Sequence, residues 1–160
     1  MDKNNEFKTA YNNYGEMLYR IAFVYLANQD DVEDVLQDVF ISFLQNPSKF
    51  KNEEHKKAWL IRTTQNKSIN LLKSSSRKNV SIEDIQIQSD DTDNDLHIDI
   101  LKQIISLDEK YKTVVILYYY NDYSVGEIAQ ILKISKSAVK MRLKRSRELL
   151  KIQLEDYENE

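Results

Sequence analysis

The sequence predicts an all-α fold: two small helical domains joined by a flexible linker, with a helix-turn-helix in the C-terminal domain. Its 160 residues include only two Gly and one Pro, whereas β-rich folds need many turns that use both. Apolar residues recur at helical spacing in both halves. Between the halves, the stretch SSSRKNVSIEDIQIQSDDTDND (residues 74–95) has no sustained helical period. Its low hydrophobicity and high charge favour a flexible segment.

These observations predict a domain at 1–77, an acidic linker at 78–96, a domain at 97–155 and an acidic tail at 156–160. Cys is absent, which excludes disulfides, thiol catalysis and Cys-ligated zinc. His55 and His97 lie far apart in the sequence, and there is no Gly-rich phosphate loop. We therefore expect no metal, no cofactor and no enzymatic activity. Neither a secretory signal nor an apolar run of roughly 18 residues is present, so we expect a cytoplasmic protein without membrane insertion.

Acidic and basic residues are grouped in separate blocks along the chain, although the net charge of the whole protein is only −3. Residues 30–38 contain five carboxylates and no base, and residues 56–78 contain seven bases and no acid. Residues 83–99 contain seven acids and no base, and residues 133–151 contain eight bases and one acid. Because charges are screened over about 8 Å at physiological salt, a phosphate contact depends on such local blocks more than on the total.

The first half contains a strongly amphipathic helix over residues 32–44. Its apolar side chains follow the i, i+3, i+4, i+7 spacing, and Asp34, Gln37, Asp38 and Ile41 project from another face. Asp30 or Asp31 is expected to cap its N-terminus. A solvated acidic face is the ordinary interpretation of such a surface when the helix stands alone.

A loop over residues 46–55 and a second helix over residues 58–73 follow. The helix interleaves aromatic, amide and basic side chains, the combination that single-stranded nucleic acid requires for stacking, base-edge hydrogen bonds and phosphate neutralisation. Trp59 also fits a core position, and Asn66 also fits a solvated amide, so neither residue is decisive alone.

The second half contains a helix-turn-helix signature. Ser124 and Glu127 have the spacing of a capping box. A short turn at residues 133–135 follows, and Ser135 can cap the next helix, whose Val139 and Leu143 should face inward. The apolar stretch 114–118 supplies a packing partner.

Basic residues of this last helix then lie on its exposed face. Such a helix can enter a major groove, with its first residues at base edges and its cations on phosphates. A solvated basic helix in a bundle is the alternative, but the capping box and the turn length favour DNA binding. The residues expected to contact DNA are Ser135, Lys136, Ser137, Lys140, Arg142, Lys144 and Arg145.

The two halves together resemble an extracytoplasmic-function (group IV) sigma factor of the sigma-70 family of bacterial RNA polymerase. The stretch DVEDVLQDVFISFL (31–44) is similar to the family's D-x-E-D-x-x-Q-E/D-x-F helix, and Phe50 with AWLIRTTQN (58–66) to its F…WL-x-R-x-x-x-N segment. Residues 107–150 are similar to its region with the y-s-x-x-E-I-A and V-x-x-R-L-x-R patterns. Lys133 departs from the family, which usually has Gly there.

The resemblance implies a promoter-specificity factor that binds core RNA polymerase, duplex −35 DNA and melted −10 DNA, and that promotes melting. It implies that Asp34, Gln37, Asp38 and Ile41 bind the polymerase. Phe50 and Asn66 match positions that line the family's pocket for a flipped base, and the expected −10 contacts are Phe50, Trp59, Arg62, Asn66 and Lys67. The helix beginning near Lys136 would read the −35 element. An anti-sigma protein is a further implied partner.

Two other interpretations stay open. A conventional helix-turn-helix regulator explains residues 97–155 equally well, but not the spacing of the first half, and it should bind duplex DNA as a free dimer. A sigma-like helper would bind polymerase and read DNA poorly.

Overall fold

The computed structural model describes residues 3–45, 50–74 and 95–150, the last range with side chains from residue 100. The chain divides into two compact units, Met1–Lys78 and Asn79–Glu160, and every regular element in the described ranges is a helix. The prediction of an all-α, two-domain fold is confirmed. The predicted tail, and the predicted linker except its last two residues, lie outside the described ranges; those two residues already belong to a helix.

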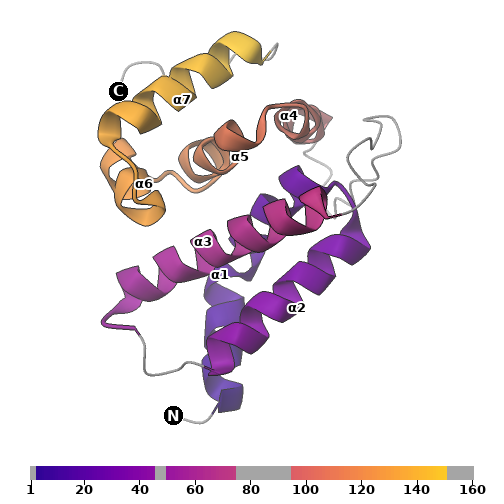
Figure 1. Ribbon diagram of the computed structural model, residues 1–160, viewed down its shortest axis with the longest axis vertical. Helices are drawn as coiled ribbons and strands as arrows, with labels where there is room; N and C mark the ends of the chain where they lie inside the picture. The colour runs from indigo at the N-terminus through magenta and orange to yellow at the C-terminus, as the bar shows by residue number, and fades with distance from the viewer. Residues whose placement is uncertain (1–2, 46–49, 75–94, 151–160) are drawn as a thin grey trace. The chain divides into compact units, whose positions relative to one another are not determined.

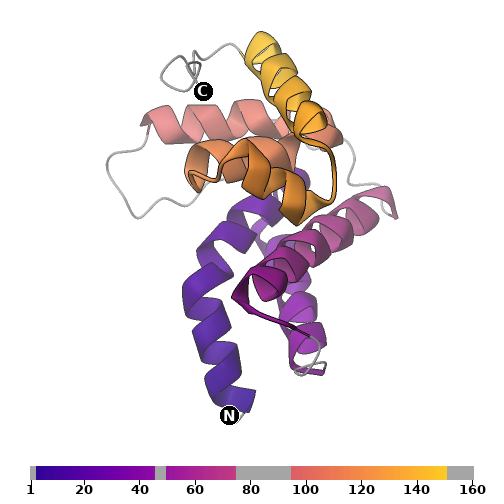
Figure 2. The ribbon, with the colours of Figure 1, turned by 90° about the vertical axis from the view of Figure 1, so that its left-hand side faces the viewer.

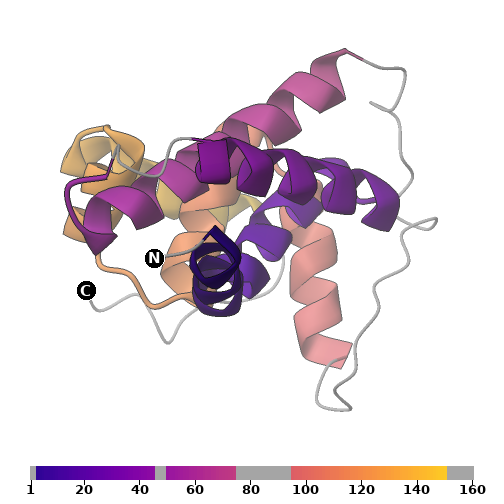
Figure 3. The same ribbon diagram turned by 90° about the horizontal axis from the view of Figure 1, so that it is seen from below.

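The first unit is built from α1 (Lys3–Leu26), α2 (Gln29–Gln45) and α3 (Glu53–Lys73), each of which packs against the other two (Figure 1). Figure 3 views α1 nearly end-on. Residues 21–26 of α1 are all buried. The core is completed by one face each of α2 and α3, through Val32, Val39, Phe43, Leu60 and Ile61.

The apolar face of α2 follows the predicted spacing, and Val35, Leu36 and Phe40 are buried with the residues above. The predicted cap is wrong. Asn28, not Asp30 or Asp31, accepts a hydrogen bond from the Asp31 backbone N–H at 3.0 Å. Ala27 adopts a positive φ of 54° between α1 and α2, and α2 begins at Gln29. Asp30 and Asp31 therefore lie in the first turn of α2, where their negative charges interact favourably with the positive end of the helix dipole.

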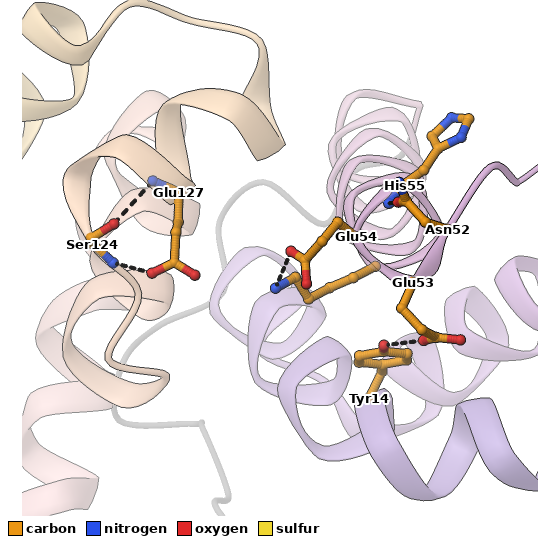
Figure 4. A network of polar contacts seen from close by, with 8 residues as sticks. Tyr14, Asn52, Glu53, Glu54, His55, Ser124 and Glu127 are labelled. Atoms are coloured by element: carbon orange, nitrogen blue, oxygen red, sulfur yellow. Dashed lines mark hydrogen bonds and ion pairs between the residues drawn. The ribbon is translucent and has the colours of Figure 1, made fainter.

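The helix α3 begins five residues earlier than predicted. Asn52 is its N-cap, and the Asn52 side chain accepts from the His55 backbone N–H at 2.8 Å (Figure 4). Glu53 and Glu54 occupy the first turn. An Asn followed by two acids is a start signal, and the sequence interpretation overlooked it because the aromatic and basic pattern begins later.

The second unit contains α4 (Asp95–Ile105), α5 (Glu109–Val115), a π-helical turn η4 (Ile116–Tyr120), α6 (Val125–Leu132) and α7 (Lys136–Leu149). The helix α7 packs against α5 and α6 (Figure 2). The apolar stretch 114–118 is fully buried, as predicted. The π-helical turn at its end was not predicted, because no sequence pattern separates one wider turn from an α-helix.

Both predicted caps of the helix-turn-helix are present. The Ser124 hydroxyl accepts from the Glu127 N–H at 3.1 Å, and the Glu127 carboxylate accepts from the Ser124 N–H at 3.0 Å (Figure 4). Lys133 then adopts a left-handed conformation (φ 58°, ψ 44°). The Ile134 N–H bonds to the Ala129 carbonyl at 3.1 Å, which closes the turn as in a Schellman motif. The Ser135 hydroxyl caps α7 by accepting from the Ala138 N–H at 3.0 Å.

Candidate polymerase and nucleic-acid interfaces

The acidic face of α2, defined by Asp34, Gln37, Asp38 and Ile41, is exposed over its whole length. It lies opposite the apolar side chains that anchor the helix. Ile41 is 47% exposed, which is unusual for a large apolar residue in this protein. Neither Asp34 nor Asp38 forms an ion pair within the described ranges. The arrangement is an exposed surface of carboxylates around one apolar side chain.

Phe50 is held in an aromatic cluster at the start of α3. Its ring centroid lies 5.6 Å from Phe43, 5.7 Å from His55 and 5.5 Å from Trp59. The Lys51 backbone N–H donates to His55 Nδ1 at 3.2 Å, which ties the residue after Phe50 to the helix. Three rings therefore fix the position of Phe50, which is half-buried.

Asn66 is exposed, and it lies two helical turns after Trp59 on the same face of α3. Arg62 lies between them and is half-buried. Lys67 projects about 100° further round the helix. The structure thus brings Phe50 and Trp59 into contact and places Asn66 along the same face, about 10 Å further on.

Part of the positive charge of α3 is neutralised locally. Lys56 pairs with Glu53 at 3.0 Å, and Lys57 pairs with Glu54 at 3.0 Å. The Tyr14 hydroxyl donates to Glu53 at 2.7 Å (Figure 4). That hydrogen bond, helped by Lys56, lowers the pKa of the Glu53 carboxyl. The first-turn acids, which the block 56–78 does not include, therefore neutralise the first two cations of that block.

The basic face of α7 is built as the sequence predicts. Val139, Leu143 and Ser146 are buried. The buried Ser146 hydroxyl donates to the Arg142 carbonyl at 2.6 Å, so burial does not leave it unpaired. The exposed side chains of this helix and its cap include Ser135, Lys136, Ser137, Lys140, Lys144 and Arg145. An exposed cationic face on the second helix of a helix-turn-helix fits contact with a phosphate backbone.

The arginines of α7 are not equivalent. Arg142 is half-buried and donates to the Lys110 carbonyl of α5 at 3.4 Å. Arg147 donates to the Tyr119 hydroxyl at 3.1 Å. Arg145 is exposed and pairs with Glu148 at 3.2 Å, and this carboxylate raises the pKa of the guanidinium. Of the predicted DNA contacts, Arg142 and Arg145 therefore both have partners within the protein, and Arg142 is the more buried of the two.

The sequence interpretation overlooked Met141, which is 66% exposed at the middle of the basic face. Its helical position gives the signal: Met141 lies two residues from both Val139 and Leu143, so it points away from the face that they bury.

No group of three or more His, Cys, Asp or Glu side chains gathers in a metal-binding arrangement in the described parts of the chain. In those same parts, no helix is both long and apolar enough to span a bilayer.

Family comparisons match both halves of the chain. The Sigma-70 region 2 family matches residues 10–78, and the Sigma-70, region 4 family matches residues 97–150. The RNA polymerase sigma factor SigV of Bacillus subtilis is 31% identical over 152 residues, which cover 91% of this chain and 89% of SigV. The ECF RNA polymerase sigma factor SigW of the same organism is 28% identical, covering 89% of this chain and 86% of SigW.

Solved structures share the fold. CnrH, in complex with the cytosolic domain of CnrY, superposes with a TM-score of 0.69 at 23% identity, covering 91% of this chain and 85% of CnrH. The sigma factor RpoE, in complex with the anti-sigma factor NepR from Bartonella quintana, gives a TM-score of 0.70 at 22% identity, covering 92% and 98%. With two family matches in order along one chain and a relative aligned over nearly its full length, the protein belongs to the extracytoplasmic-function sigma factors of the sigma-70 family and recognises promoters for RNA polymerase.

Proposed function

We propose that the two units divide the work of promoter recognition between them. In this proposal residues 1–77 bind core polymerase and the melted −10 element, residues 97–155 bind the duplex −35 element, and residues 78–96 link them. The observation that carries the proposal is the pair of exposed faces of opposite charge, the acidic face of α2 and the basic face of α7. An acidic face complements a basic protein surface, and a basic face complements DNA.

In the first unit, the acidic face of α2 supplies the polymerase contact through Asp34, Gln37, Asp38 and Ile41. The aromatic cluster supplies a rigid wall for an extruded base, because the rings that surround Phe50 fix it before DNA arrives. Extrusion costs a few kcal/mol, so a site formed in advance favours the melted promoter. Arg62, Asn66 and Lys67 would then contact the displaced strand.

The protein would act by binding alone, in the cytoplasm, with the polymerase as the only catalyst. Neither unit needs high affinity for DNA, because binding through two linked sites raises the effective concentration of the second contact. As CnrH and RpoE were each solved with a second protein, we also propose that an anti-sigma protein binds this chain and competes with core polymerase.

The first experiment is in vitro transcription from a genomic template library, with core polymerase and with or without this protein. New start sites that share −35 and −10 elements are the expected result, and they also reveal the promoter sequence. Tight duplex binding by the free protein without new starts would instead support a conventional helix-turn-helix regulator. Polymerase binding without new starts would support a helper protein.

The variant Lys140→Glu tests the −35 assignment within the same assay. It should weaken promoter binding by on the order of 1–3 kcal/mol and leave core binding unchanged. Lys8→Glu makes the same charge change at an exposed position of α1 and should behave as the parent protein.

A further inference from the structure

Met141 is an exposed apolar side chain on a strongly cationic helix. Large apolar side chains with high exposure are few in the described ranges, and with a value of 66% Met141 is more exposed than Leu149 (58%), which lies near the end of the same helix. A single exposed apolar side chain is ordinary on a protein surface, so what distinguishes Met141 is its place within a candidate DNA-binding face.

The fold gives Met141 no structural task. The inner face of α7 is filled by Val139 and Leu143, which are 0% and 2% exposed. Met141 projects roughly opposite to both, since two residues turn an α-helix by about 200°. Its neighbours one turn away are Ser137 and Arg145, both exposed.

The surroundings of Met141 favour a polyanion over an apolar protein partner. The helix α7 carries six basic residues and a single acid, Glu148. An apolar protein surface that covered Met141 would also desolvate Lys140, Lys144 and Arg145, at a cost that apolar contact would not repay. DNA can contact all of these side chains, because its phosphates can pair with the cations while Met141 contacts the bases in the groove.

A major groove offers one apolar group, the 5-methyl of thymine. We infer that Met141 reads a thymine methyl in the −35 element and is a specificity-determining residue of this protein. The inference depends on the proposed function, in which α7 enters the −35 major groove. Met suits the task because its unbranched, polarisable side chain adapts to the shape of the surface it contacts.

The test is a thymine-to-deoxyuridine scan of the −35 element, since deoxyuridine pairs as thymine does and lacks only the methyl group. Holoenzyme binding is measured by fluorescence anisotropy on each singly substituted promoter. With the parent protein, one or two substitutions should weaken binding by about fourfold, the equivalent of burying a single methyl group. With Met141→Ala, the same substitutions should have no effect, and with Met141→Leu most of the effect should return.

Leu149→Ala is the matched control, because it truncates another exposed apolar side chain of α7; it should keep the full response to deoxyuridine. A scan without any sensitive thymine, or a sensitivity that persists in Met141→Ala, would overturn the inference. A failure of the proposed function can be distinguished from a failure of the inference about Met141. In the former case, holoenzyme with Lys140→Glu would bind the unmodified promoter as well as holoenzyme with the parent protein does. If Met141→Ala instead weakens binding of core polymerase or of an anti-sigma protein while the scan is unchanged, Met141 serves a protein contact and the inference is wrong.

Discussion

Lys133 has a left-handed backbone at the turn of the helix-turn-helix, where its φ is 58°. A side chain with a Cβ is strained there, and Gly is not. We predict that Lys133→Gly stabilises the second unit by about 0.5–1 kcal/mol, since relief of strain exceeds the added chain entropy. Urea denaturation, followed by circular dichroism, measures the change.

One control separates strain from charge. Lys133→Ala removes the same charge and keeps the Cβ, so an equal gain in this variant would contradict the strain argument.

Gly126→Ala is the opposite substitution within α6, where the nearest atom to an added Cβ is Lys136 Cε at 3.5 Å, an ordinary contact. It should also stabilise the second unit, but by less than the roughly 0.5–1 kcal/mol of a helix interior, because Gly126 lies in the first turn of α6.

Thr64 and Ser68 bury their hydroxyls on the inner face of α3. Both residues are 0% exposed, and neither hydroxyl has a hydrogen-bond partner. A buried, unpaired polar group costs about 1–3 kcal/mol. Thr64→Val keeps the shape and removes the hydroxyl, so we expect it to stabilise the first unit by about 1 kcal/mol, measured by thermal unfolding. Thr9→Val, at an exposed site of α1, should be nearly neutral, and a destabilising Thr64→Val would mean that a buried water satisfies the hydroxyl.

Lys112 is a buried cation of α5, only 6% exposed. Burial lowers its pKa from 10.5 to about 8, against the opposing effect of Glu109 and Asp108. Because the folded pKa is the lower one, the folded state bears the full cost of the charge below pH 8, and the cost falls as pH rises from about 8 to 10.5. We predict that Lys112→Met stabilises the protein by roughly 1–3 kcal/mol at pH 7.

The pH dependence shows whether the stabilisation by Lys112→Met comes from removing a buried charge. The difference in unfolding free energy between Lys112→Met and the parent should shrink as pH rises from 7 to 10. A difference that is constant across this range would show that the gain comes from packing rather than from the removal of a desolvated charge.

The elements differ in how far the sequence predicts them. The buried and exposed faces of α2 and α7 can be predicted from residue spacing alone, because the buried side chains of each helix form one apolar stripe. The start of α3 was missed because a cap is a local signal that the aromatic pattern obscured. The aromatic cluster around Phe50 could not be predicted, since it joins residues from α2, the following loop and α3, and no periodicity reports a contact between elements.

The proposed division of roles between α2 and α3 predicts separable defects in the first unit. Asp38→Arg should weaken core binding by tenfold or more, because it places a cation within the face proposed to meet a basic partner. Asn66→Ala should leave core binding intact and reduce open-complex formation more than initial promoter binding. Analytical ultracentrifugation with core polymerase and permanganate reactivity of the −10 thymines measure the two steps.

Matched variants keep the test of α2 and α3 specific. Glu16→Arg makes the same charge change on the exposed side of α1, where it breaks only a surface ion pair with Arg20. Asn13→Ala truncates another exposed amide. Both variants should bind core polymerase and open the promoter as the parent protein does. If Asp38→Arg and Asn66→Ala lose the same step to the same extent, the two helices do not have separate roles.

At the scale of the whole molecule, the charge pattern would let one small protein bind two partners of opposite charge in the proposed function. The net charge of −3 disfavours nonspecific adhesion of the free chain to DNA. The basic face of α7 can still attract phosphates that come close to it, because acidic residues further away than about 8 Å are largely screened. Promoter contact should therefore be weak until the polymerase supplies the second anchor, as expected for two linked sites.

Salt dependence tests this separation of charge. Each cation that neutralises a phosphate contributes nearly one unit to the slope of log affinity against log salt concentration. We predict that Lys140→Gln and Lys144→Gln each reduce the slope for holoenzyme binding to the promoter by about one, and that the double variant reduces it by about two. Asp38→Asn should leave that slope unchanged once the holoenzyme is formed, and should alter only the salt dependence of assembly with core polymerase. A slope that responds to Asp38→Asn and not to the lysines would mean that α7 does not carry the phosphate contacts, and that the acidic face of α2 influences DNA directly.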